Sequence, residues 1–124
     1  MESRRDARKG DESFPRRFRL GSNRNYRYVY SRGNSTHSRN VVLILLKGRE
    51  QRFGFSVSGK VGNAVTRNRI RRYMREDVRR MRARLKSGKY VFVARPGVDR
   101  LSHEALTREL RRTLSRANLL KEES

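Results

Sequence analysis

The sequence predicts one small α+β domain, in which a mostly antiparallel sheet of three to four strands packs with helices in the order α-β-β-α-β-α. The 124 residues suffice for a single domain, and with only 34% of them hydrophobic the core must be small. Apolar residues recur at helical spacing in some segments, whereas others have the β-branched and aromatic content of strands. The alternation of these segments gives the predicted order.

The chain begins with a polar, charged segment, residues 1–13, which we predict to be a disordered basic tail. The predicted domain follows as residues 14–120. Its first helix is expected at 23–32. Ser22 is a suitable N-cap for this helix because its hydroxyl can accept a free backbone N–H, and Gly33 is a suitable C′ residue.

Three segments have the character of strands. The continuous apolar run 41–46 predicts a buried strand, and the alternating run 52–58 predicts a half-buried one. Only a polar turn separates these two runs, so we expect them to pair as an antiparallel hairpin. The β-branched and aromatic segment 89–95 predicts another strand. The polar segment 34–39 is either a turn or a short edge strand.

Two further helices complete the predicted domain. A long helix is expected from 64 to 86, with Asn63 as its N-cap and Gly88 as its stop signal. The last helix is expected after the N-cap Ser102 and has a leucine-rich face. The polar end of the chain, residues 121–124, is expected to fray.

The long helix is amphipathic. Its apolar face is formed by Ile70, Met74, Met81 and Leu85. Its basic face is formed by Asn68, Arg71, Arg72, Arg75, Arg79 and Arg82. A solvated face usually mixes charges of both signs, whereas here only Glu76 and Asp77 interrupt the basic run. Cations at a helix N-terminus also oppose the macrodipole. We therefore interpret this helix as a nucleic-acid-binding element.

The composition supports a polyanionic partner. The formal net charge is +21, and 27 of the 33 basic residues are arginines, which suit bidentate phosphate contacts. No apolar run approaches transmembrane length, no signal peptide is visible, and the basic helix lacks the Trp/Phe-rich side of a membrane-surface helix. Cysteine is absent. We expect a cytoplasmic protein that binds nucleic acid and no membrane.

One motif is far more specific than this basic character. It is spaced K-x-G-x-A-x-x-R-N-x-x-R-R and consists of Lys60, Gly62, Ala64, Arg67, Asn68, Arg71 and Arg72. It closely resembles the signature of the bacterial ribonuclease P protein component, and the likeness in order and length runs from about Phe18 to Leu120. The resemblance implies RNA binding by Lys60, Arg67, Asn68, Arg69, Arg71, Arg72 and Arg75. It also implies a left-handed β-α-β crossover, where residues alone would favour a right-handed one.

The resemblance also implies the reaction. In bacterial ribonuclease P the catalyst is an RNA, which holds the magnesium ions, and the protein assists it. A protein of this kind would bind the ribonuclease P catalytic RNA and precursor tRNA, but not DNA. The holoenzyme would remove the 5′ leader by phosphodiester hydrolysis and leave tRNA with a 5′-phosphate. We expect no cofactor on the protein alone, with Mg²⁺ held mainly by the partner RNA.

The first helix holds the candidate leader-binding residues. Tyr26 and Tyr30 face one side of it and either pack on the core or stack on unpaired bases. The resemblance favours stacking, because two aromatics at matching positions line the leader cleft in the family. Phe18 is a third candidate, although a hydrophobic anchor is the simpler interpretation. Another aromatic on the sheet is common in the family, and Ile44 stands at that position here. One of the phenylalanines of 52–58 could replace it.

No catalytic or metal-binding residue is predicted. His37 and His103 stand in polar segments without carboxylates at ligand spacing, so we interpret both as surface histidines. The adjacent acids Glu76 and Asp77 should point in different directions on a helix. A ribosomal or RNA-chaperone protein would share the charge and size, but the motif spacing argues against it. A DNA-binding protein is a third class, disfavoured because no helix-turn-helix precedes the basic helix.

Overall fold

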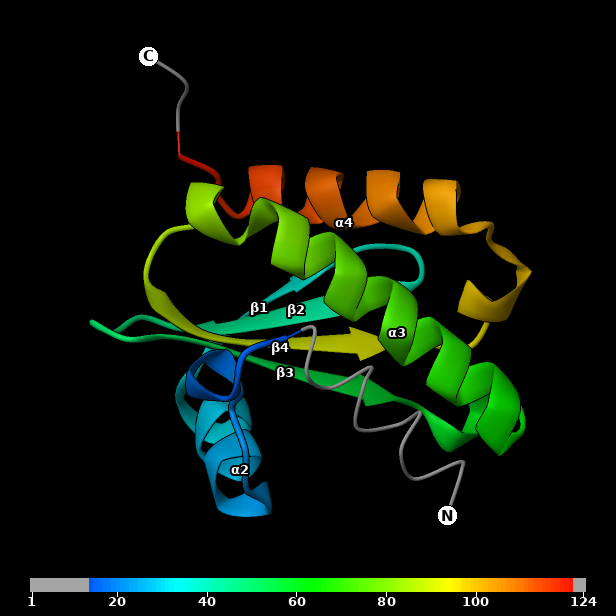
Figure 1. The fold of residues 1–124 in the computed structure, drawn as a ribbon, viewed down its shortest axis with the longest axis horizontal. Coiled ribbons are helices and arrows are strands. Elements are labelled where there is room, and N and C mark those ends of the chain that lie inside the picture. Colours follow the sequence, from blue (N-terminus) through cyan, green and yellow to red (C-terminus); the bar gives the residue numbers. More distant parts are fainter. Residues whose placement is uncertain (1–13, 122–124) are drawn as a thin grey trace.

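The computed structural model describes residues 14–121. It consists of a four-stranded sheet with helices on both faces (Figure 1). The predicted single α+β domain is confirmed. The helices and strands are α2 (Asn23–Arg32), β1 (Asn34–His37), β2 (Val41–Leu46), β3 (Gln51–Val57), α3 (Ala64–Met81), β4 (Gly88–Ala94) and α4 (His103–Arg116). The tail predicted at 1–13 and residues 122–124 lie outside the described residues, whereas the amide of Lys121 donates to the Arg84 carbonyl at 2.7 Å.

The strand order is β1-β2-β4-β3, with β4 antiparallel to β2 and parallel to β3. The hairpin predicted for 41–46 and 52–58 is therefore wrong, because β4 lies between these strands. The physical reason is the two-sided burial of β4, in which Tyr90, Val91 and Phe92 are all 0% exposed. A strand that is apolar on both faces belongs in the centre of a sheet. The segment 34–39 supplies an edge strand, β1, antiparallel to β2.

Strand β3 forms the other edge of the sheet, next to the segment that precedes α2. The amide of Leu20 donates to the carbonyl of Phe53 at 2.8 Å, and Arg19 forms a parallel bridge with Phe53. This segment before α2, called the lead-in below, thus runs along the sheet edge. The lead-in is thereby held against the open edge of β3, and α2, which follows it, packs on β2 and β4.

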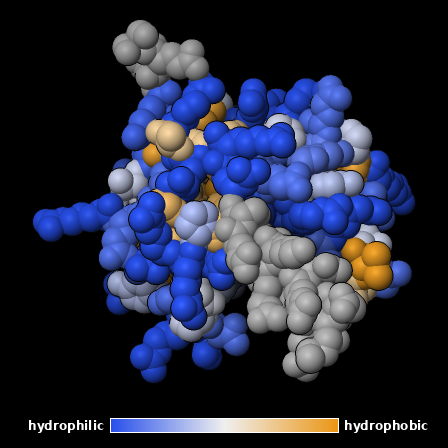
Figure 2. Space-filling view, in the orientation of Figure 1, coloured by the Kyte–Doolittle hydropathy of each residue, from blue (hydrophilic) through white to orange (hydrophobic). Residues whose placement is uncertain are grey.

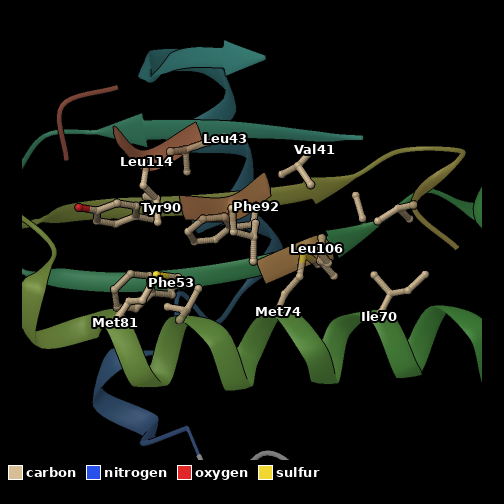
Figure 3. Packing of buried hydrophobic residues seen from close by; sticks show 14 of the residues in the cluster. Val41, Leu43, Phe53, Ile70, Met74, Met81, Tyr90, Phe92, Leu106 and Leu114 are labelled. Atoms are coloured by element: carbon tan, nitrogen blue, oxygen red, sulfur yellow. The ribbon is translucent and has the colours of Figure 1, made fainter. Parts of the chain in front are cut away.

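The core has two layers of unequal size. The larger layer lies between the sheet and helices α3 and α4, where Phe53, Met74 and Phe92 are among the residues packed together (Figure 3). The smaller layer lies under α2 and consists of Leu20, Val29, Ile44 and Val91. Each large apolar side chain buried in this way contributes roughly 1.5–3 kcal/mol. Because α2 lies on the opposite face from α3, the two helices approach each other only across the β3 edge (Figure 1).

All three predicted N-caps are confirmed. The side chains of Ser22, Asn63 and Ser102 accept the backbone amides of Asn25, Thr66 and Ala105 respectively. Each cap satisfies an amide that the first helical turn leaves without a partner. The helix starts were therefore readable from single residues.

The predicted helix ends were less accurate. Helix α3 ends at Met81 rather than at residue 86, and its last turn tightens into a 3-10 helix (Arg82–Arg84). The side-chain amide of Gln51 donates to the carbonyls of Arg82 and Leu85, a long-range contact that satisfies the helix end. Gly88, predicted as the stop, instead begins β4. Gly33 follows α2 as expected but has a φ of −81°, so it is not a left-handed C′ residue.

Candidate RNA-binding surface

The basic face of α3 is turned away from the core because the apolar stripe of the helix is packed on the sheet. Ile70, Met74 and Val78 are all buried, which turns the positions between them outward. Lys60 lies in a short 3-10 turn (Gly59–Val61) directly before the helix, and the other six predicted RNA-binding residues lie within the helix, between Arg67 and Arg75. The face of the molecule drawn in Figure 2 is correspondingly mostly hydrophilic. The structure thus brings the seven residues together on one continuous stretch.

Three arginines of this stretch crowd one another. Arg67, Arg71 and Arg75 follow at intervals of one helical turn and are partly buried. Burial, followed by the charges of Arg75 and Arg67, lowers the pKa of Arg71. The carboxamide oxygen of Asn68 accepts from the Arg71 guanidinium at 2.7 Å and so fixes its direction. Cations held this close are stabilised by an anion placed between them.

A groove of about 470 Å³ lies between α2, β3 and this part of α3. Its lining consists of Asn23, Tyr26, Arg27, Tyr30, Phe55, Ser56 and Arg71. The rings of Tyr26 and Tyr30 are 6.4 Å apart between centroids and are tilted by 48°. Aromatic faces next to guanidinium groups form the usual surface for single-stranded nucleic acid. The structure therefore brings Tyr26 and Tyr30, which were predicted to bind the leader, together with Arg71, which was predicted to bind RNA.

A smaller hollow of about 200 Å³ lies on the other side of Tyr26. Tyr26 and Phe55 line both spaces, while Arg75 lines the smaller hollow and Arg71 the larger groove. Since Arg71 and Arg75 are one turn apart, successive turns of α3 present one cation to each space. The two hollows thus share the rings of Tyr26 and Phe55, and each has an arginine of α3 in its lining.

Tyr26 has a structural role in addition to its place in the groove. Its hydroxyl accepts the backbone amide of Phe55 at 3.0 Å, at the edge of β3, and its ring lies against Gly54. Burial raises the pKa of the Tyr26 phenol, so the hydroxyl stays protonated. Tyr30 is 44% exposed. The two tyrosines therefore differ, because Tyr26 both packs and lines the groove whereas Tyr30 mainly lines it.

The other aromatic candidates are placed differently. Phe18 lines neither hollow, and the guanidinium of Arg82 lies 3.8 Å from its ring centroid. Ile44 is buried beneath α2, away from the groove. Of the two phenylalanines that could replace it, Phe53 belongs to the core and only Phe55 is half-buried at the groove wall. Phe55 therefore occupies the position of the third groove aromatic.

His103 was misinterpreted from the sequence. Its Nε2 lies 2.9 Å from the Asp77 carboxylate and its Nδ1 lies 3.9 Å from that of Glu76. Its ring stacks on Tyr73 with centroids 4.2 Å apart. Helix α4 thereby contacts both acids of α3, although these are adjacent in sequence. No local pattern indicates this contact, since it depends on how the two helices pack.

Two absences are established for residues 14–121. No group of three or more His, Cys, Asp or Glu side chains is placed to hold a metal ion. None of the helices in this part of the chain has the length and apolar character needed to cross a membrane.

Comparison with known proteins identifies the family. The family model described as Ribonuclease P matches residues 14–118, which include the lead-in, the groove and the basic helix. The chain belongs to the ribonuclease P protein family. It is therefore a protein subunit of ribonuclease P, and ribonuclease P RNA is its partner.

Relatives of this ribonuclease P protein match over almost their whole length. It is 40% identical to the ribonuclease P protein component of Brevibacillus brevis, over 86% of this chain and 88% of the relative. It is 37% identical to that of Bacillus velezensis, over 88% and 97%. Among solved structures, the Staphylococcus aureus RNase P protein matches with a TM-score of 0.79 at 26% identity, over 84% of this chain and 98% of that protein. The Thermotoga maritima RNase P protein gives 0.72 at 26% identity, over 79% and 96%.

Proposed function

We propose that this subunit assists the catalytic RNA in the Mg²⁺-dependent removal of the 5′ leader from precursor tRNA in the cytoplasm. It does so by binding the catalytic RNA along α3 and the single-stranded leader in the groove beside it. The observation that supports the proposal most directly is the shared position of Arg71, which belongs to the basic face of α3 and also lines the aromatic groove. One cation thus stands at the junction of two RNA-binding surfaces.

Binding of the catalytic RNA is assigned to the start of α3. The proposed contacts are made by Lys60, Arg67, Asn68, Arg69, Arg71, Arg72 and Arg75. Arginine forks match phosphate oxygens in pairs, and a bound phosphate would offset the repulsion between neighbouring guanidinium groups. It would also offset the unfavourable placement of cations at a helix N-terminus. The bound RNA would therefore stabilise the start of α3, where the free helix has only uncompensated positive charge.

Binding of the leader is assigned to the groove. The exposed ring of Tyr30 and the side chain of Phe55 would stack on bases, while Arg27 and Arg71, which line the same groove, would contact phosphates. Stacking tolerates every base because each base has a π-face. This tolerance suits an enzyme whose precursor substrates carry different leaders. Phe18 remains a weaker candidate, because its ring is occupied by Arg82.

The proposed division of chemistry leaves bond cleavage to the RNA. Mg²⁺ held mainly by the catalytic RNA supplies the activated water for phosphodiester hydrolysis. Residues 14–121 offer no cluster of carboxylates or histidines suited to the ion. The side chains of this subunit bind and orient the substrate, and the product is tRNA with a 5′-phosphate.

The test compares precursor tRNA with mature tRNA, which lacks the leader, on the reconstituted holoenzyme. Tyr30→Ala is the sharper variant because Tyr30 is exposed, whereas Tyr26→Ala also removes a hydrogen bond to Phe55. Loss of one stacked base should weaken precursor binding by roughly 5- to 150-fold. Binding of mature tRNA should stay unchanged, and Tyr30→Phe should behave like the parent protein.

Equal losses for both tRNAs would contradict the leader assignment and would place Tyr30 at the catalytic RNA instead. Circular dichroism and thermal unfolding of the free variants provide the control for folding. Tyr26→Phe separates the two roles of that residue. It keeps the ring but removes the hydroxyl acceptor, so it should lower stability by about 1 kcal/mol and leave stacking intact.

A further inference from the structure

We propose that Tyr28, with Arg32 and Lys89, is a second stacking position for the leader, reached by nucleotides that continue upstream from the groove. The inference rests on the proposed function, since it extends the same leader across α2. Tyr28 belongs to neither hollow described above. It defines a separate place on the surface, built by α2 and β4 together.

The local geometry suits a nucleotide. Tyr28 is 49% exposed, which is more than Tyr30. The Arg32 guanidinium carbon lies 5.8 Å and the Lys89 ammonium nitrogen 5.7 Å from the centroid of its ring. One aromatic ring with two neighbouring cations supplies both contacts of a single-strand site, a face for the base and charge for the phosphate.

The position on α2 connects this site with the groove. Val29 faces the sheet, so at about 100° per residue Tyr26 and Tyr30 lie to one side of it and Tyr28 to the other. The exposed side of the helix between them presents Arg27 and then Arg24. Arg27 already lines the groove. A single-stranded leader that leaves the groove would therefore pass Arg27 and Arg24 on the outside of α2 before it reaches Tyr28.

The charge of this region selects an anion. No Asp or Glu occurs from Ser13 to Arg49, so α2 contains three arginines and no acid. The first acid beyond, Glu50, is bound by Arg52 at 2.7 Å. A helix surface that served solvation alone would mix signs to form pairs one turn apart. Cations around an exposed ring, in a stretch from Ser13 to Arg49 without acids, favour a nucleic-acid strand, and continuity with the groove favours the leader over the catalytic RNA.

The experiment measures binding of precursor tRNAs with a nested series of 5′-truncated leaders to the reconstituted holoenzyme. With the parent protein, affinity should rise as the leader grows long enough to pass beyond the groove. Tyr28→Ala should abolish this rise in affinity, which is a loss of about fivefold or more for long leaders. It should leave the binding of short leaders and of mature tRNA unchanged. Tyr28→Phe should restore the rise, because the ring face is kept. Arg32→Gln should reduce it and lower its salt dependence.

Two controls separate the possible failures. Arg116→Gln removes one exposed cation from α4 and should not change the dependence on leader length. Tyr30→Ala should weaken binding of precursor tRNA for every leader long enough to fill the groove. If Tyr30→Ala had no such effect, the proposed function would be wrong, whatever the result for Tyr28. Should Tyr28→Ala weaken all leaders and mature tRNA equally, the site contacts the catalytic RNA and the inference is wrong. It is equally wrong if long leaders bind to Tyr28→Ala as they do to the parent protein.

Discussion

Gly54 determines where the ring of Tyr26 can lie in the groove. A Cβ atom at this position would come within 2.7 Å of the Tyr26 ring. Real Cβ contacts are not this short, so the tyrosine reaches the β3 edge only because residue 54 is glycine. Once there, its hydroxyl accepts the amide of Phe55. A single missing side chain therefore sets both the shape of the groove and the hydrogen bonding of the strand edge.

Gly54→Ala should displace the Tyr26 ring and break its hydrogen bond to Phe55. Stability should fall by about 1 kcal/mol, since the lost bond is of that size. Binding of precursor tRNA should weaken while that of mature tRNA stays the same. Urea unfolding and binding to the holoenzyme are the measurements.

A double-mutant cycle tests the cause. In a Tyr26→Ala background the new methyl group meets no ring, so Gly54→Ala should have little further effect on stability. Additive losses would show that the alanine acts through the strand backbone rather than through Tyr26.

Helix α3 has two different faces, an apolar face packed on the sheet and a basic face turned away from it. Its buried stripe, including Met74 and Val78, fixes the helix on the sheet, while its first turns collect cations against the macrodipole. The cap at Asn63 holds those turns in place. Further along, Glu76 lies 4.0 Å from Arg72 and also approaches His103. Asp77 therefore faces α4, whereas Glu76 lies between His103 of α4 and Arg72.

Arg67→Ala should weaken assembly with the catalytic RNA, because a charge-assisted contact to phosphate is lost. Hydrogen bonds to charged groups are worth about 1.5–3 kcal/mol, which predicts a loss of roughly 10- to 150-fold in affinity. Circular dichroism should stay native. Arg116→Ala is the matched control, since it removes the same charge from an exposed position on α4 and should have little effect. An unfolded Arg67→Ala protein would instead assign this partly buried residue to the fold.

The whole molecule combines a small core with a net charge of +21. Self-repulsion of this size opposes the compact state, and a polyanion relieves it. Three N-caps, the Gln51 contact at the end of α3 and the two apolar layers hold the fold against that repulsion. Stability and RNA binding are therefore linked, and the bound protein should be the more stable form.

RNA affinity should fall steeply with salt. If each of the six cations proposed at the start of α3 neutralises one phosphate, the plot of log affinity against log salt should have a slope of about −4 to −5. Arg67→Ala should reduce the slope by about 1. Filter binding or fluorescence titration over a salt series measures it. A nearly flat response would show that phosphate contacts do not dominate binding.

Local signals in the sequence determined most of the elements. The N-caps, the strand segments and the two faces of α3 depend on residues that are close together, so composition and periodicity were sufficient. The motif from Lys60 to Arg72 indicated the family, and the pair Tyr26 and Tyr30 was recognised as one side of a helix. The hand of the crossover came from the family resemblance alone, because no residue pattern specifies it.

Tertiary structure decided whatever depends on distant residues. Strand β4 replaced the expected partner of β3, because burial on both faces is a property of the whole sheet. Phe55, rather than Ile44, reached the groove, and His103 met the acids of α3 through helix packing. Likewise, only folding brought Lys89 beside Tyr28. Such contacts join residues far apart in the chain, where no local propensity or spacing can indicate them.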